Sequence, residues 1–421
     1  WLLLGMTGMG YAVGAQAYWV IVGEMIGIAA SWGFISRKLK RLGDETDSIT
    51  LPDVLAAKFD DRWHLIRGVA VVIIVVMVTT YVSAQMVATG KAFSGFIGLD
   101  YRAGVIIGAV IIIGYTFVGG YKAVSYTDVV QGVLMLSGLI AVPLVAISAA
   151  GGWQQMTATL HAYDPSFIDM FAVLDGSTTG FVAAVSFAAI GLPFLGVPQM
   201  LIRYMSARDE EELKKARIVS IAVLFVFLFG AVTAGIAGRA LFPGLEDSEL
   251  VFPTLASELF PPLLTGVLLV IVLSAIMSTV DSLLLLASSS IVRDTMQKML
   301  GSTKSDATLA GYGKVVTIII GVIAVVVAVY MAENKLIFWF VLFSWSGLGA
   351  AFGPVVLALL YDRRTTGAGI VAGMLGGFLT SVVWVQYFKA GTYGLYEAIP
   401  GFTVAALATV VVSRLGGSRA S

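Results

Sequence analysis

Two acidic residues, Asp128 and Asp281, lie inside stretches that are otherwise apolar enough to cross a membrane. A carboxylate at that depth costs about 2.5–3.5 kcal/mol even on the scale derived from insertion experiments. Such a group normally faces a partner, an ion or water, and no Lys or Arg embedded in these stretches stands beside either acid. The two carboxylates are therefore candidates for an ion path.

The residues around Asp281 add oxygen atoms to one side of the same predicted helix. At 100° per residue, four of them fall within an arc of about 100°: Ser274, Ser278, Asp281 and Ser282. Hard cations take oxygen ligands from carboxylates, hydroxyls and carbonyls, so this stripe predicts a cation site. The alternative for the hydroxyls is structural, because Ser and Thr also bond back to carbonyls one turn earlier or pack against neighbouring helices.

The composition indicates an all-α, multi-pass membrane protein. Of 421 residues, 58% are hydrophobic and only 12% are charged, whereas a soluble domain has about 25% charged residues. Basic and acidic residues balance at 26 each, so no nucleic-acid partner is indicated. With no Cys and two His, we expect neither a transition-metal site nor a His-based triad. No nucleophile–base constellation stands out, so we do not expect an enzyme.

Apolar segments near the length of about 20 residues that a bilayer requires recur along the whole chain. We treat 1–421 as one transmembrane domain. The predicted spans are 1–14, 17–36, 65–92, 103–119, 125–149, 180–202, 218–238, 264–292, 315–331, 336–360, 367–388 and 395–413. The first is too short to cross a bilayer and the chain opens inside it without Met, so we expect the N-terminus to be incomplete.

The distribution of basic residues predicts the orientation of these spans. One set of alternate connections holds 21 of the 26 Lys and Arg residues, including Lys122 and Arg203. We expect that set and the C-terminus to be cytoplasmic, in a cell membrane. Within 205–217, Ser206 is followed by acids and then by bases, which predicts a separate solvated helix with Ser206 as its N-cap.

The span 180–202 contains a predicted break. Gly191, Pro193, Gly196 and Pro198 fall within eight residues, and Gly and Pro free backbone carbonyls from the helical ladder. In hydrocarbon, such groups are tolerated only where they are buried in protein or line a cavity. Secondary transporters use discontinuous helices to place half-helix ends at their substrate. A simple proline kink is the alternative.

Secondary transporters of this kind often contain inverted repeats, which would give the break a partner in the other half. Counting five spans back from 180–202 places that partner at or just before Trp1. This count predicts a five-plus-five core with a first repeat at about 1–149 and a second at about 180–360. Two extra helices would follow at about 367–413.

Three segments resemble motifs of the sodium/solute symporter family, and the likeness is closest to its sodium/proline symporter branch. The segments are Thr116-Phe-Val-Gly119-Gly120-Tyr-Lys-Ala123-Val124-Ser-Tyr-Thr127-Asp128, Ala275-Ile-Met277-Ser278-Thr279-Val-Asp281-Ser282 and Phe352-Gly353-Pro354. The likeness covers essentially the whole chain. It implies a LeuT-like inverted-repeat core with broken helices, alternating access, and Na⁺-coupled uptake of a small organic solute.

The resemblance also implies which residues bind the ion and the solute. A first sodium site would use the Ala275 carbonyl with the Ser278 and Thr279 hydroxyls. A second sodium position would use Asp128, Ser278, Asp281 and Ser282. The substrate pocket would use Tyr81, Gln85, Ile190, Phe194, Val197 and Pro198. Proline carriers resemble Trp, Tyr and Gln at positions 190, 194 and 197, so this more apolar pocket leaves open proline, another small amino acid or another small monocarboxylate.

Glu24 is a third embedded acid, near the middle of its predicted span. No motif surrounds it, and we assign it no role. A transporter-like sensor domain is the competing class of function, and a signalling module after Ser421 would favour it. The leading interpretation is a symporter whose partners are Na⁺, a small solute and the lipid bilayer.

Overall fold

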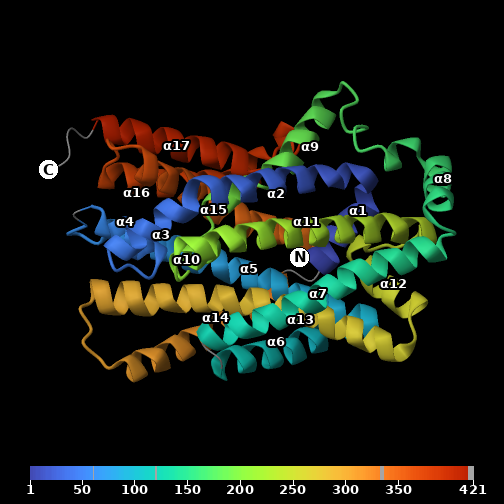
Figure 1. The fold of residues 1–421 in the computed structure, drawn as a ribbon, viewed down its shortest axis with the longest axis horizontal. Coiled ribbons are helices and arrows are strands. Elements are labelled where there is room, and N and C mark those ends of the chain that lie inside the picture. Colours follow the sequence, from blue (N-terminus) through green and yellow to red (C-terminus); the bar gives the residue numbers. More distant parts are fainter. Residues whose placement is uncertain (60, 119–120, 332–335, 416–421) are drawn as a thin grey trace.

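The computed structural model describes residues 1–59, 61–118, 121–331 and 336–415. These residues form helices and connections, and no strand occurs among them (Figure 1). Eleven helical segments of the described chain are long and apolar enough to cross a membrane. The prediction of an all-α, multi-pass membrane protein is therefore confirmed.

The first apolar segment, Leu2–Glu45, contains two helical stretches that run in opposite directions (Figure 1). The first is short and consists of η1 (Leu2–Met6) and α1 (Thr7–Val13), and the second is built from α2 (Tyr18–Ala30), η3 (Ser31–Ile35) and α3 (Ser36–Glu45). The chain turns at Gly14, where φ is +62° and an added Cβ would lie 2.1 Å from the Phe167 carbonyl oxygen. Only glycine fits such a position without strain.

The other helices comprise those of the predicted spans, several with ends that extend beyond the prediction, and three short helices in the connections between spans. They are α4 (Leu51–Ala57), α5 (Leu65–Ile97), α6 (Tyr101–Val118), α7 (Tyr121–Ala149), α8 (Trp153–Tyr163), α9 (Thr178–Ala189), α10 (Pro198–Met205), α11 (Glu210–Leu241), α12 (Val251–Leu259), α13 (Pro262–Ser289), α14 (Asp306–Met331), α15 (Ile337–Tyr361), α16 (Gly367–Val383) and α17 (Ala398–Leu415). A π-helical segment, η7 (Ser290–Met299), continues α13. Helices α16 and α17 pack against each other and against α15.

The prediction of a separate helix capped by Ser206 is wrong. Ser206 ends α10, and the next helix begins at Glu210 and continues without interruption to Leu241. Its N-cap is Asp209, whose carboxylate accepts hydrogen bonds from the backbone N–H groups of Glu211 and Glu212. A carboxylate that accepts two N–H groups in the first turn is a strong cap, so the solvated segment and the span form one helix.

The two ends of the molecule differ in the connections that they carry. Helices α3, α4 and α10 and the end of α17 lie together at one end, and α8 and α12 lie at the other (Figure 1). The first end carries the basic connections 37–67 and 203–217. We call it the basic end.

Helices α2 and α9 touch through glycines. An added Cβ at Gly23 would lie 2.0 Å from the Ala188 carbonyl oxygen, and one at Gly27 would lie 2.0 Å from that of Gly191. Conversely, a Cβ at Gly191 would lie 1.9 Å from the Gly23 carbonyl oxygen. Small residues spaced four apart allow this close approach between membrane helices. We call Gly23, Gly27 and Gly191 the glycine seam.

Candidate functional site

The chain breaks where the glycines and prolines predicted it. Helix α9 ends at Ala189, the 3₁₀ turn η5 (Leu192–Leu195) follows, and α10 begins at Pro198. Val197 is extended, with ψ at 119°, so the helical ladder is interrupted. The freed carbonyl of Ile190 accepts a hydrogen bond from Trp345 Nε1 at 3.2 Å. The segment is therefore two helices with a turn between them, and a simple kink is excluded.

A cavity of about 140 Å³ lies beside this break. We call it the aromatic cavity. It is lined by Trp1, Leu2, Glu24, Tyr81, Phe194, Leu224, Val341, Leu342 and Trp345. The rings of Phe194 and Trp345 meet edge to face, with centroids 5.1 Å apart. Two of the predicted substrate residues, Tyr81 and Phe194, thus share a cavity with Trp345, which the sequence analysis missed.

The other predicted substrate residues do not line the aromatic cavity. Ile190, Val197 and Pro198 are buried in the break itself, where their backbone shapes the turn. Gln85 lies one turn along α5 from Tyr81 and is 1% exposed. Neither atom of its amide has a hydrogen-bond partner among the described residues. Their assignment to the substrate pocket stays a prediction.

A second cavity, of about 380 Å³, shares Tyr81 and Trp345 with the first. We call it the hydroxyl cavity, because Ser278, Thr279 and Ser282 of α13 line it. Ser278 Oγ and Thr279 Oγ1 donate hydrogen bonds to the Ala275 carbonyl at 3.2 and 3.0 Å. A hydroxyl that donates still carries lone pairs that can accept a bond or bind a cation. The two hydroxyls predicted for the first sodium site therefore face one cavity next to the aromatic one, and the Ala275 carbonyl accepts hydrogen bonds from both.

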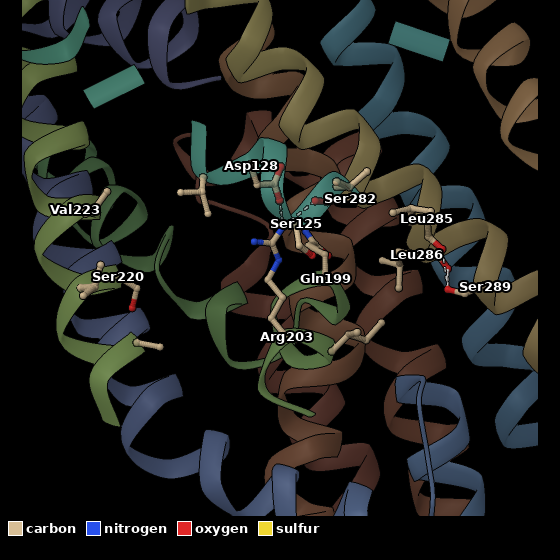
Figure 2. A pocket seen from close by; sticks show the side chains of 15 residues that line it. Ser125, Asp128, Gln199, Arg203, Ser220, Val223, Ser282, Leu285, Leu286 and Ser289 are labelled. Atoms are coloured by element: carbon tan, nitrogen blue, oxygen red, sulfur yellow. Dashed lines mark hydrogen bonds and ion pairs between the residues drawn. The ribbon is translucent and has the colours of Figure 1, made fainter. Parts of the chain in front are cut away.

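Arg203 of α10 bridges two helices at this cavity. Figure 2 shows its guanidinium pointing to Asp128 of α7 and Ser282 of α13. Nη2 lies 2.8 Å from Asp128 Oδ2 and donates to Ser282 Oγ at 2.8 Å. The sequence analysis predicted no basic partner for Asp128, because it assigned Arg203 to a cytoplasmic connection. The missed signal was that Arg203 lies on the half-helix that starts at the predicted break.

Asp281 faces away from the hydroxyl cavity. Its side chain is fully buried, and Oδ1 accepts a hydrogen bond from the Thr116 hydroxyl of α6. Oδ2 has no hydrogen-bond partner among the described residues. The predicted oxygen stripe is thus divided, with Ser278 and Ser282 on the cavity and Asp281 toward α6. Gly119 and Gly120, part of the motif between Thr116 and Asp128, lie outside the described residues.

A third cavity, of about 600 Å³, reaches the start of α11 next to the basic connection 203–217, where Ala216 and Ser220 line it. Figure 2 shows the side chains that line this cavity. The cavity lies between α7, α10, α11 and α13 and reaches Ser289. It shares Asp128, Arg203 and Ser282 with the hydroxyl cavity. The three cavities therefore form a series from the broken helix to the basic end.

Comparisons with known proteins agree with this geometry. Residues 1–377 match the family model of the sodium:solute symporter family. The chain is 36% identical over 421 residues to the high-affinity proline transporter PutP of Bacillus subtilis (strain 168). The aligned region covers 99% of this chain and 87% of that protein. The chain is also 36% identical to the sodium/proline symporter of Staphylococcus aureus, over 99% of this chain and 82% of that one.

A solved structure shows the same fold. A Na⁺-coupled sialic acid symporter, in a substrate-bound outward-open state, superposes with a TM-score of 0.78 at 18% identity, covering 98% of this chain and 89% of that chain. The predicted LeuT-like architecture with a broken helix is thereby confirmed. On the extent of the family match and of these identities, the chain belongs to the sodium:solute symporter family.

Proposed function

We propose that this protein couples inward Na⁺ flow to the uptake of a small amino acid, proline first, by alternating access. The observation that carries the proposal is the contact between two cavities of different chemistry. The hydroxyl cavity offers oxygen ligands, the aromatic cavity offers an apolar surface, and Tyr81 and Trp345 belong to both. Relatives with 36% identity over nearly the whole chain are described as proline transporters.

The ion would bind on α13. The Ala275 carbonyl and the Ser278 and Thr279 hydroxyls supply the first sodium site, because hard cations prefer such oxygens. Asp128, Ser278 and Ser282 would supply a second position, and the carboxylate of Asp128 lies on the route to the basic end. Asp281, the fourth predicted member, bonds Thr116 and would have to turn toward Ser282 to join them. The solute would bind against Tyr81 and Phe194, with the remaining predicted residues shaping the break.

The shared wall explains how the ion and the solute influence each other. An ion that orders Tyr81 or Trp345 from one side changes the surface that the solute meets on the other side. Such coupling is a free energy shared between two sites, so each ligand must strengthen the other by the same factor. We therefore expect proline to raise the apparent Na⁺ affinity as much as Na⁺ raises that for proline.

The orientation follows from charge. We infer that the basic end and the C-terminus are cytoplasmic, in the cell membrane. The series of cavities would then lead toward the cytoplasm. At the opposite end, Glu249 accepts a bond from Lys91 Nζ at 2.7 Å and bonds from the N–H groups of Ile337 and Phe338 at 2.9 Å. This arrangement supports an inward-facing state, closed on the outside.

The division of the chain into repeats is part of the same proposal. A first repeat at about 1–149 and a second at about 180–360 would move against each other, with the extra helices at about 367–413 packed on the second. Helices α16 and α17 contact α15, which supports the last assignment.

Uptake into proteoliposomes tests the proposed function. An inward Na⁺ gradient should drive accumulation of labelled L-proline, and an equal K⁺ gradient should not. Competition by amino acids, sugars and carboxylates then ranks the solutes. Saturable uptake of a sugar or a monocarboxylate without uptake of proline would show that proline is not the solute. Binding of proline with no Na⁺-driven accumulation would favour a sensor.

A further inference from the structure

The aromatic cavity contains one acid that the proposed function does not use. Glu24 lies on α2, lines this cavity, and is 3% exposed. Among the described residues, no hydrogen bond or ion pair involves its carboxylate. Glu24 is therefore a buried carboxylate with a cavity in front of it and no partner from the described protein.

Most other buried acids of the described chain have cationic partners, and Asp281 has the Thr116 hydroxyl as a donor. Asp294 lies 2.6 Å from Arg67, and Glu249 lies 2.7 Å from Lys91. Glu397 lies 2.8 Å from Lys389. Burying a charge without a partner is costly, and in a membrane such acids normally belong to functional sites. Glu24 has neither a cation nor a hydroxyl donor among the described residues, which makes it a candidate for binding a ligand.

The walls of the cavity favour a cation. Aromatic side chains surround the space in front of Glu24: Trp1, Tyr81, Phe194 and Trp345. The faces of aromatic rings attract ammonium groups, and they do so most strongly where water is excluded. A carboxylate among aromatic rings therefore matches a positively charged nitrogen that carries a small apolar body.

We propose that Glu24 is a specificity-determining residue that binds the protonated nitrogen of the solute. The cavity of about 140 Å³ is well below the roughly 300–1,000 Å³ of pockets for drug-sized ligands, so the solute is small. This inference rests on the proposed function and adds to it a solute class: amines and imines that carry a positive charge are accepted, and isosteric acids without that nitrogen are rejected.

The glycine seam fixes the place of Glu24 relative to the break. Gly23, its neighbour in the sequence, touches Ala188 and Gly191 of the broken segment without side chains in between. Phe194 follows three residues after Gly191 on that segment. The acid and the aromatic ring therefore belong to one wall, held by backbone contact. A cation bound by this wall meets both groups in a fixed geometry.

A matched pair of solutes tests the proposal in the purified protein in proteoliposomes. L-Proline carries a protonated ring nitrogen, and tetrahydrofuran-2-carboxylate has a ring oxygen in its place. Because Glu24→Gln removes a charge-assisted hydrogen bond, the proline concentration for half-maximal uptake should rise about 10–100-fold. The competition constant of the oxygen analogue should stay within about twofold, because no charged contact is lost. Glu24→Asp, which keeps the charge, should retain more of the preference for proline than Glu24→Gln does.

The outcomes separate this inference from the proposed function. If Glu24→Gln lowers the affinity for proline and for its oxygen analogue by the same factor, or changes neither, Glu24 has a structural role. That result would overturn the inference and leave the proposed proline uptake standing. If the wild-type protein transports no proline, the proposed function fails. The inference is then tested by thermal stabilisation of the wild-type protein and Glu24→Gln with further pairs of small amines and their nitrogen-free isosteres. Equal stabilisation by both members of every pair would overturn it.

If Glu24→Gln does not fold, the Glu24→Asp variant provides the test. Moving the carboxylate back by one methylene should change the ratio of the affinities for proline and for its oxygen analogue. The Na⁺ concentration for half-maximal uptake is measured in parallel for the variant and the wild type. A ratio equal to that of the wild type would overturn the inference.

Discussion

Asp294 and Glu24 are both buried acids, with 0% and 3% of their surface exposed, yet their surroundings differ completely. Asp294 lies 2.6 Å from the Arg67 guanidinium, and its two oxygens share the proton of the Thr50 hydroxyl at 2.9 and 3.0 Å. Glu24 faces a cavity and lacks such partners among the described residues. Burial alone therefore does not assign a role to an acid. The set of groups around the carboxylate does.

Asp294 belongs to a cluster that connects three parts of the basic end. Arg67 of α5 also bonds Asp53 of α4 at 2.9 Å, and Thr50 caps α4 by accepting the N–H of Asp53. The cluster therefore holds the connection between α3 and α5 against η7. Arg293 Nε lies 3.6 Å from the other oxygen of Asp53, so two cations and two acids balance in this cluster. The cluster therefore holds the fold together, whereas the carboxylate of Glu24 is left for a ligand.

The comparison predicts that Asp294→Ala causes the largest loss of stability. Removing this carboxylate leaves Arg67 buried beside one acid in place of two, and breaking a buried ion pair costs about 3–5 kcal/mol. Unfolding of the detergent-purified protein measures the change in the free energy of unfolding. Glu24→Gln is the contrasting variant and should lose much less, because it breaks no ion pair. Equal losses of unfolding free energy in the two variants would contradict the distinction between Asp294, which holds the fold together, and Glu24, which is left for a ligand.

A substitution in the glycine seam should have the next largest effect. The Cβ of Gly191→Ala would lie 1.9 Å from the Gly23 carbonyl oxygen, so the backbones of α2 and α9 must separate. Overpacking of this kind costs about 1–3 kcal/mol. Because Glu24 stands beside Gly23, the separation should also weaken proline binding.

Gly33→Ala is the matched control for the seam. Its added Cβ would have no neighbour within 4 Å, although Gly33 continues the same helix as Gly23. Stability and proline half-saturation should both stay near wild-type values. If Gly191→Ala behaved like this control in both measurements, the seam would not be what positions Glu24.

The sodium site should respond more specifically than the seam does. Ser278→Ala and Thr279→Ala each remove one oxygen ligand and leave the fold nearly unchanged, because both side chains border a cavity. We expect the Na⁺ concentration for half-maximal uptake to rise about tenfold in each variant, equivalent to about 1.4 kcal/mol. Proline uptake as a function of Na⁺ concentration measures it. Unchanged half-saturation in both variants would remove these hydroxyls from the site.

Asp128 is an intermediate case between Asp294 and Glu24, and its effect should be the smallest. One oxygen pairs with Arg203, whose side chain is 54% exposed, and the other has no partner among the described residues. Pairs this exposed contribute about 0–1 kcal/mol, so Asp128→Asn should lose little stability. Its Na⁺ half-saturation should rise severalfold, since a carboxylate on the proposed ion route becomes a neutral amide. Wild-type Na⁺ dependence would indicate that Asp128 only orients Arg203.

Most of the fold could be predicted from the sequence, because its signals are local. Hydrophobic runs located the spans, and the density of glycine and proline between Gly191 and Pro198 located the break. The error at Ser206 shows the limit of local signals, since Asp209 three residues later offered a charged cap. Side-chain preferences at a helix start do not say which of two nearby candidates the backbone uses.

The site could be predicted only in part, because it depends on neighbours in space. Periodicity placed Ser278 and Asp281 on one stripe, yet α6 approaches one edge of that stripe and brings Thr116 to Asp281. Arg203 was assigned by its place in a connection, but its long side chain reaches back to Asp128. Glu24 received no role because no motif marks it. Its meaning depends on the absence of a partner, which a sequence does not show.

The glycine seam has a consequence for transport run in reverse. Because α2 and the broken segment touch backbone to backbone, Glu24 and Phe194 should travel as one rigid piece when access alternates between the two sides. A solute that leaves the cell would then bind to the same surface as a solute that enters it. We expect vesicles loaded with mixed solutes, under an outward Na⁺ gradient, to release them in the same order of preference in which they are taken up.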